Sequence, residues 1–237
     1  MSQHIVKAYD EELKTLQSLI GKMGELTFQQ IEQATTSLVK CNKTLAQEVI
    51  DRDYEIDQLE TMVDELAVRI LALRQPVASD LRMVVAALKI SNQVERIADY
   101  ASNIAKRTLL LSESPPVHII EGLIFLVRMP KQMIKKALKA FITNDLTLAL
   151  RVWHMDHEVD SYYNAYLLQL FDAMIAAPKN IGPCTQLLFA AKNIERIGDQ
   201  STNIAEAVYT MVTGKPFKES DAIIPCHPCK GEAPEKK

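Results

Sequence analysis

Four pairs of acidic residues with i, i+4 spacing are the features of this 237-residue sequence that could do chemistry. On a helix this spacing places both carboxylates of a pair on one face, where two like charges destabilise the helix unless something compensates them. Carboxylate oxygens are the ligands that hard cations prefer, and they also bind iron. The sequence therefore predicts metal ligands in these pairs: Asp53 and Asp57, Glu95 and Asp99, Asp156 and Asp160, Glu195 and Asp199.

The pairs belong to an internal duplication. Residues 95–105 and 195–205 are identical at seven of eleven positions, and residues 53–57 are echoed by residues 156–160. This period is too long for a solenoid, whose repeats have roughly 20–50 residues. We interpret the duplication as two tandem three-helix bundles.

The position of each pair relative to the nearest chain reversal predicts that the pairs meet. Around a reversal near Val77, Asp57 lies 20 residues before and Glu95 lies 18 residues after. In antiparallel helices these residues stand at the same level to within about one turn of ~5.4 Å, and a reversal near Pro178 gives a similar match in the second repeat. We therefore expect four carboxylates to converge in each bundle, in a surface groove between two helices.

Other interpretations of the acidic pairs stay open. An acidic stripe on a helix is usually a solvated face whose charges are satisfied by nearby arginines, here Arg52, Arg96 or Arg196. The clusters could also serve a metal-storage or metal-dependent hydrolytic protein. A di-iron site of the helical-bundle kind is poorly supported, because it needs Glu-x-x-His on two helices. No histidine of this sequence has a glutamate three positions before it.

Charge and missing motifs argue against several functional classes. No catalytic serine, cysteine or histidine arrangement and no phosphate-cradling glycine loop occurs, so we predict that the protein is not an enzyme. A formal net charge of −3 gives no general attraction to nucleic acid. The first residues lack the apolar core of a signal peptide, and no apolar run is long enough for membrane insertion. We expect a cytoplasmic protein.

Sparse glycine and regularly spaced apolar residues predict an all-α fold. Only 7 glycines occur, aromatic residues make up 6% of the chain, and prolines mark the breaks between helical segments. Two tandem three-helix bundles are expected in residues 1–112 and 113–216, followed by a mostly disordered tail in 217–237. The six helices are expected at roughly 6–40, 44–74, 79–110, 117–142, 145–176 and 183–213.

Several of these motifs in combination resemble the PhoU family. Residues 74–82, Arg-Gln-Pro-Val-Ala-Ser-Asp-Leu-Arg, are similar to the junction between the second and third helices of PhoU proteins. The doubled Glu/Asp-x-x-x-Asp motif, and Glu-Arg-Ile-x-Asp leading to Asn-Ile-Ala, are similar to the hallmarks of the family. The resemblance extends from about residue 5 to residue 214.

This resemblance implies a fold and a function. It implies two similar three-helix bundles in a cytoplasmic accessory protein of the ATP-driven phosphate transporter, which represses the phosphate-starvation response. Such a protein links the ATPase subunit of the phosphate ABC transporter to a membrane sensor histidine kinase, and homodimers are common. Some members bind multinuclear iron or other divalent ions (Fe, Mn, Mg or Zn) through the acidic motifs. The resemblance thus assigns metal ligation to the eight acidic residues named above.

Two segments depart from the duplicated pattern or from the family. The second repeat has no copy of the Asp-Leu-Arg at 80–82, so this element serves either partner contact or local structure, with Asp80 as a helix cap and Arg82 in an ion pair. In the tail, Cys226 and Cys229 form a Cys-x-x-Cys that lacks the second Cys or His pair of a zinc site. We expect reduced thiols rather than a disulfide framework.

Overall fold

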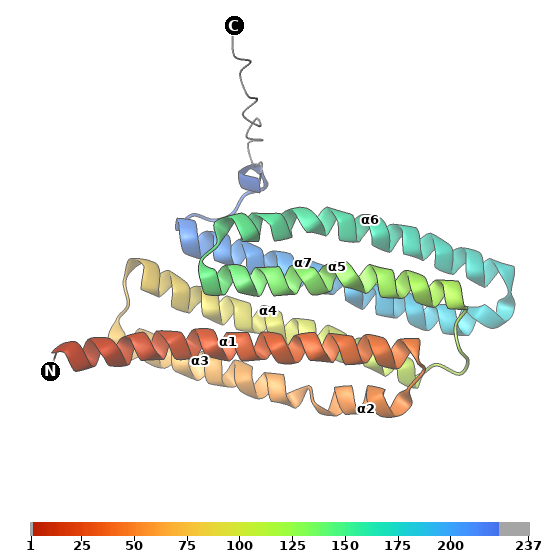
Figure 1. Cartoon of the computed structure of the whole chain (residues 1–237), viewed down its shortest axis with the longest axis horizontal. Coiled ribbons are helices and arrows are strands. Elements are labelled where there is room, and N and C mark those ends of the chain that lie inside the picture. The colour runs from red at the N-terminus through yellow and green to blue at the C-terminus, as the bar shows by residue number, and fades with distance from the viewer. Residues whose placement is uncertain (1, 223–237) are drawn as a thin grey trace, which may run out of the picture.

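The chain forms a long all-helical molecule (Figure 1). The structure is a computed structural model that describes residues 2–222, with side chains from Tyr9 onward, and contains only helices and their connections over that range. The predicted all-α class is confirmed. The elements are α1 (Ser2–Val39), α2 (Lys43–Asp51), α3 (Tyr54–Arg74), α4 (Ala78–Leu109), α5 (Val117–Thr143), α6 (Leu146–Ala176), η1 (Pro178–Asn180), α7 (Ile181–Thr213) and η2 (Glu219–Ala222).

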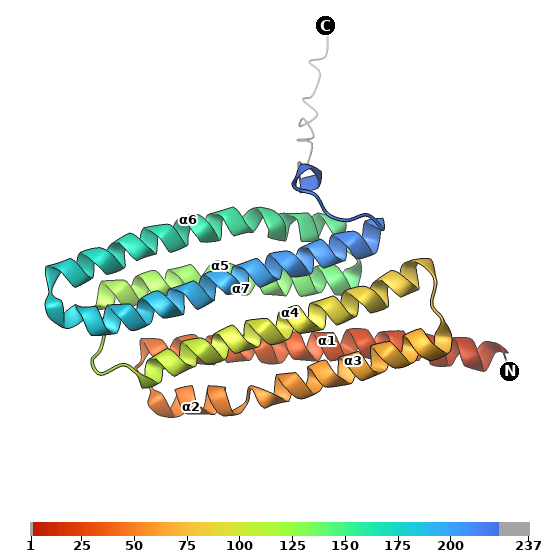
Figure 2. The same ribbon diagram turned by 180° about the vertical axis from the view of Figure 1, so that it is seen from behind.

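Two bundles lie side by side, the first formed by α1 to α4 and the second by α5 to α7 (Figures 1 and 2). Helix α4 packs against α7 and α1 packs against α5, so a single apolar core runs through both bundles. Helices α4 and α7 are antiparallel. Near one end Arg82 Nε donates to the Met211 carbonyl oxygen at 2.9 Å, and near the other the Arg107 guanidinium lies 4.8 Å from the centre of the Phe189 ring. The predicted boundary at residue 112 falls in the loop between α4 and α5.

The helix predicted at 44–74 is broken, so the prediction of one continuous helix was wrong. Helix α2 ends at Asp51 and α3 begins at Tyr54. The cause lies in α1, because the buried Gln30 amide donates to Asp53 Oδ1 at 2.8 Å and lies 3.5 Å from the Val49 carbonyl oxygen. A side chain inserted into the backbone ladder is a known cause of helix interruption. The counterpart in the second bundle, α6, is continuous.

Helix α7 begins about two residues earlier than the start predicted from the break at 178–183. It starts at Ile181, directly after the short helix η1, and carries Pro183 in its first turn. Proline is tolerated there because the first-turn N–H groups have no intrahelical partner. Pro130 lies inside α5 without ending it.

Residues beyond α7 fold back onto the second bundle. Gly214 adopts φ +72°, which ends the helix. Phe217 then packs on Trp153 and Tyr209, with ring centres 5.6 and 5.2 Å away. His154 Nε2 lies 2.7 Å from the carbonyl oxygen of Ala222 in η2.

The predicted disordered tail therefore does not begin at residue 217, because residues 217–222 pack against α6 and α7. Its remaining part lies outside the described residues and includes Cys226 and Cys229. No helix among residues 2–222 is both long and apolar enough to cross a membrane.

Candidate functional site

The structure brings together the four predicted carboxylates of the first bundle. Asp53 at the α2–α3 break and Asp57 on α3 face Glu95 and Asp99 on α4, and we call these four residues the first acidic face. Burial raises the pKa of Glu95 to about 7, and the charges of Asp99, Glu60, Asp57 and Asp53 add to the rise. Partial desolvation and the same neighbours, Asp53 and Asp99, also raise the pKa of Asp57, although its side chain is exposed. The predicted level match between α3 and α4 thus places these side chains within electrostatic reach of one another.

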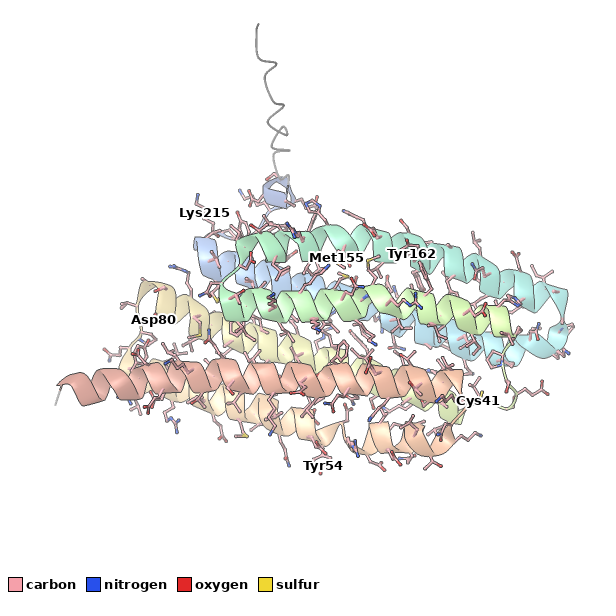
Figure 3. The ribbon with its side chains drawn as sticks, in the orientation of Figure 1. Cys41, Tyr54, Asp80, Met155, Tyr162 and Lys215 are labelled. Carbon is pink, nitrogen blue, oxygen red and sulfur yellow. The ribbon has the colours of Figure 1, made fainter. Side chains whose placement is uncertain are left out.

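The broken helix positions Asp53 in the first acidic face. Asp53 occupies the N-cap position of α3, but its side chain makes no capping hydrogen bond. Instead its Oδ1 accepts the hydrogen bond from Gln30, whose side chain is only 5% exposed. Tyr54, next along the chain, is 56% exposed and points away from the bundle (Figure 3). Gln30 of α1 therefore fixes the position of the Asp53 carboxylate. The spacing of the acidic residues in 53–57 does not predict this contact.

The four carboxylates of the second bundle also converge, between α6 and α7. We call Asp156, Asp160, Glu195 and Asp199 the second acidic face. Burial raises the pKa of Asp199 to about 6, with further contributions from Glu195 and Asp156 and an opposing one from Lys192. Burial and Asp160 raise the pKa of Asp156, and a hydrogen bond from Thr202 opposes this rise. One of its oxygens, Oδ1, is buried without a hydrogen-bond partner among the described residues.

A glycine allows Asp156 to sit close to α7. A Cβ atom at Gly198 would lie 3.3 Å from Asp156 Oδ1, which is tight, and 3.4 Å from Val159 Cγ1, which is close to ordinary van der Waals contact. The corresponding residue of the first repeat is Ala98. Glycine at 198 therefore gives room for the aspartate that the second face buries. All four residues of the second face are half-buried, whereas Asp57 and Asp99 of the first face are exposed.

The two faces differ in whether a lysine contacts one of their carboxylates. In the second face, Lys192 Nζ donates to Glu195 Oε1 at 2.7 Å and lies 2.7 Å from Oε2. The corresponding residue of the first repeat is Asn92, which donates to Glu60 Oε1 at 3.3 Å. A lysine of the first repeat, Lys106, donates to an asparagine rather than to a carboxylate.

The arginines that a solvated acidic stripe would use do not form the expected ion pairs. Within residues 9–222, no ion pair joins Arg52, Arg96 or Arg196 to either acidic face. Arg196 instead stacks over the Tyr100 ring at 5.8 Å, across the contact between α7 and α4.

The donor set of both faces fits a hard cation. It consists of carboxylate oxygens, and the orphaned Asp156 Oδ1 is a buried acceptor that an ion would satisfy. In the described part of the chain, no three acidic, histidine or cysteine side chains are gathered closely enough to coordinate one ion. Like charges repel when no ion lies between them, so ligation requires these side chains to rotate towards a shared ion. Asp53, Asp57, Glu95 and Asp99 would hold ions in one face, and Asp156, Asp160, Glu195 and Asp199 in the other.

The Asp-Leu-Arg element at 80–82 has local and inter-bundle contacts. Asp80, at the start of α4 (Figure 3), accepts a hydrogen bond from the Tyr9 hydroxyl at 3.0 Å. Helix α4 is capped by Val77, so Asp80 lies in the first turn instead of at the predicted cap position. Arg82 bonds to the Met211 carbonyl and not to a nearby acid, which replaces the predicted local ion pair.

Comparison with known proteins gives a consistent result over both bundles. A family model described as "PhoU domain" matches residues 20–108 and again residues 126–208. A relative from Caulobacter vibrioides, named "Phosphate-specific transport system accessory protein PhoU homolog", is 43% identical over 91% of this chain and 94% of its own length. One with the same name from Zymomonas mobilis is 44% identical, with 91% of each chain covered. The solved structure of PhoU from Pseudomonas aeruginosa superposes with a TM-score of 0.80 at 37% identity, covering 87% of this chain and all of that one.

Proposed function

Because the chain belongs to the PhoU family, we propose that it is an accessory regulator of phosphate transport. The observation that carries this proposal is the double match of the PhoU domain, one copy to each bundle. Relatives that are 43% and 44% identical over nearly their whole length carry the name of a phosphate-specific transport accessory protein. In this role the chain acts through binding and has no catalytic activity.

In this proposal the protein represses phosphate uptake and the phosphate-starvation response when phosphate is abundant. It acts in the cytoplasm as an adaptor, and as a homodimer, between the ATPase subunit of the phosphate ABC transporter and a sensor histidine kinase. Exposed apolar side chains at the turn of each bundle support a docking role. Leu73 and Val77 at the α3–α4 turn are 71% and 75% exposed, and Ile175 at the α6–α7 turn is 82% exposed.

Metal binding at the two acidic faces completes the proposal. A bound iron, manganese, magnesium or zinc ion supplies positive charge that offsets the repulsion among the carboxylates. Asp53 and Asp57 belong to the α2–α3 segment while Glu95 and Asp99 belong to α4, so an ion held by both pairs ties two helices together. The surface that a partner meets then depends on whether the faces are loaded.

The test is genetic and uses a phosphate-starvation reporter in the source organism grown with abundant phosphate. Deletion of the gene is expected to raise reporter expression, and the native gene is expected to restore repression. The variant Asp99→Ala/Asp199→Ala, with one change in each face, is expected to restore it poorly.

A matched control is Glu65→Ala/Asp172→Ala, which removes two exposed acids of α3 and α6 outside the faces and should restore repression fully. An unchanged reporter in the deletion strain would contradict the regulatory function. Full repression by the Asp99→Ala/Asp199→Ala variant would contradict the role of the acidic faces in it.

A further inference from the structure

We infer that Lys192 is a built-in counter-cation of the second acidic face, which competes with metal ions there and makes the two faces bind the same ion with different affinities. The inference rests on the proposed metal binding and adds a residue that decides between the faces. It follows from a difference at one position of the repeat, where the first bundle has Asn92 and the second has Lys192.

The contacts of Lys192 place its charge inside the second face. Its Nζ lies 2.7 Å from both oxygens of Glu195. It also lies 5.4 Å from the centre of the Tyr163 ring on α6, so the ammonium is attracted from both helices that form the face. The Lys192 charge reaches beyond Glu195, because it also lowers the pKa of Asp199 in opposition to burial.

The first face has no cation at the corresponding place. Asn92 is neutral, and its amide donates to Glu60 Oε1 at 3.3 Å. Asn92 therefore does not provide Glu95 with a positively charged partner. Another lysine of α4, Lys106, lies about four turns further along the helix than Asn92. Its Nζ donates to Asn103 Oδ1 at 3.3 Å, and its charge acts on Asp99 rather than on Glu95.

An ammonium and a metal ion need the same carboxylate oxygens. A lysine ammonium donates hydrogen bonds and has no lone pair to offer, so it cannot become a ligand beside the ion while it stays charged. A metal ion that binds Glu195 therefore competes with Lys192 for these oxygens and is repelled by its charge. The Lys192 side chain is 43% exposed, so it has solvent to move into, and ion pairs with such exposure are weak. The lysine thus lowers the metal affinity of the second face without abolishing it.

The test is equilibrium dialysis of Mn²⁺ against the full-length, chelator-treated protein, with each face isolated in turn. The second face is isolated by Asp57→Asn/Asp99→Asn, and the first by Asp160→Asn/Asp199→Asn. In the isolated second face, Lys192→Asn is expected to tighten Mn²⁺ binding by about 2- to 5-fold, the range that follows from the strength of an exposed ion pair. In the isolated first face, Asn92→Lys is expected to weaken binding by a similar factor.

Two control variants test whether the change in Mn²⁺ affinity comes from the charge at position 192. Lys192→Arg keeps a cation and is expected to stay close to the native affinity, while Lys89→Asn removes an exposed lysine of α4 outside both faces and should change neither affinity. Unchanged Mn²⁺ affinity in both Lys192→Asn and Asn92→Lys, with measurable binding at both faces, would overturn this inference alone. Absence of Mn²⁺ binding to the native protein would overturn the proposed metal function and this inference with it.

Discussion

The two acidic faces carry the same number of carboxylates from the same duplicated motif, yet they differ in almost everything around them. In the first face, Asp57 and Asp99 are exposed, and the chain is broken where Asp53 enters the face. In the second face every carboxylate is half-buried, and α6 runs through without a break. The duplication has preserved the charged groups and not their environment.

Three neighbours account for this divergence. Gln30 of α1 fixes the aspartate of the first face. Gly198 makes room for the aspartate of the second face, and Lys192 neutralises its glutamate. Each neighbour acts through a contact, so two motifs that are nearly identical in sequence have different electrostatics. The faces are therefore two sites with separate properties, and variants that exchange their neighbours test that difference.

The largest expected effect is on stability as a function of pH, measured in the presence of chelator. The pKa values of Glu95 and Asp199 are raised to about 7 and about 6, so the folded protein holds protons that the unfolded chain has released. The sign follows from linkage: the resulting stability is present below the unfolded pKa values near 4 and is lost as pH rises through about 7. We expect these two groups together to lower the free energy of unfolding by about 2–4 kcal/mol between pH 5 and pH 8, allowing for partial solvent screening.

Denaturant titrations of two variants assign this loss to the two faces. Glu95→Gln should remove the component whose midpoint lies near pH 7, and Asp199→Asn the component near pH 6. The comparison between the faces fails if both variants keep the native pH dependence.

The next effect is a difference in sign between the corresponding aspartates of the two faces. Asp53→Ala leaves the buried Gln30 amide without its carboxylate partner, which is expected to cost about 1–3 kcal/mol. Asp156→Ala removes a half-buried carboxylate with an orphaned oxygen, so the metal-free protein should gain up to about 1 kcal/mol.

Both values come from unfolding curves recorded in chelator near pH 8. Asp53→Asn is the matched control, because it keeps an oxygen that accepts from Gln30 and should be close to native in stability. Destabilisation of the same size by Asp53→Ala and Asp156→Ala would show that the two faces hold their aspartates alike.

The smallest effect concerns the exchange of one neighbour. Asn92→Lys brings a cation to Glu95 and is expected to stabilise the metal-free protein by roughly 0.5 kcal/mol, the value of a partly exposed ion pair. It should also lower the pKa of Glu95 from about 7. A carboxyl titration followed by NMR measures this shift, and a Glu95 pKa that does not fall would contradict the parallel with Lys192.

Much of the fold could be predicted from the sequence because its signals are local. Prolines mark the α3–α4, α4–α5 and α6–α7 connections, and the apolar periodicity predicts the long helices, though not the break between α2 and α3. The convergence of four carboxylates in each bundle follows from counting residues back and forward from the reversals near Val77 and Pro178. These inferences need only helix geometry and short connections.

The rest depends on contacts between segments that are distant in the chain. The break at Arg52 and Asp53 is made by Gln30, more than twenty residues earlier, and nothing within 44–74 signals it. The packing of residues 217–222 depends on Trp153 of α6. The sequence shows that Ala98 and Asn92 of the first repeat correspond to Gly198 and Lys192 of the second. Only the structure shows that Gly198 lies against Asp156 and that Lys192 pairs with Glu195.

The central claim, that both acidic faces bind metal, is tested most directly by elemental mass spectrometry. Untagged full-length protein purified without chelator is compared with Asp99→Ala, with Asp199→Ala and with the double variant. The account predicts that the native protein retains iron, manganese, magnesium or zinc, that each single variant loses part of it, and that the double variant loses nearly all. A native protein without bound metal after anaerobic reconstitution, or a double variant with native metal content, would contradict it.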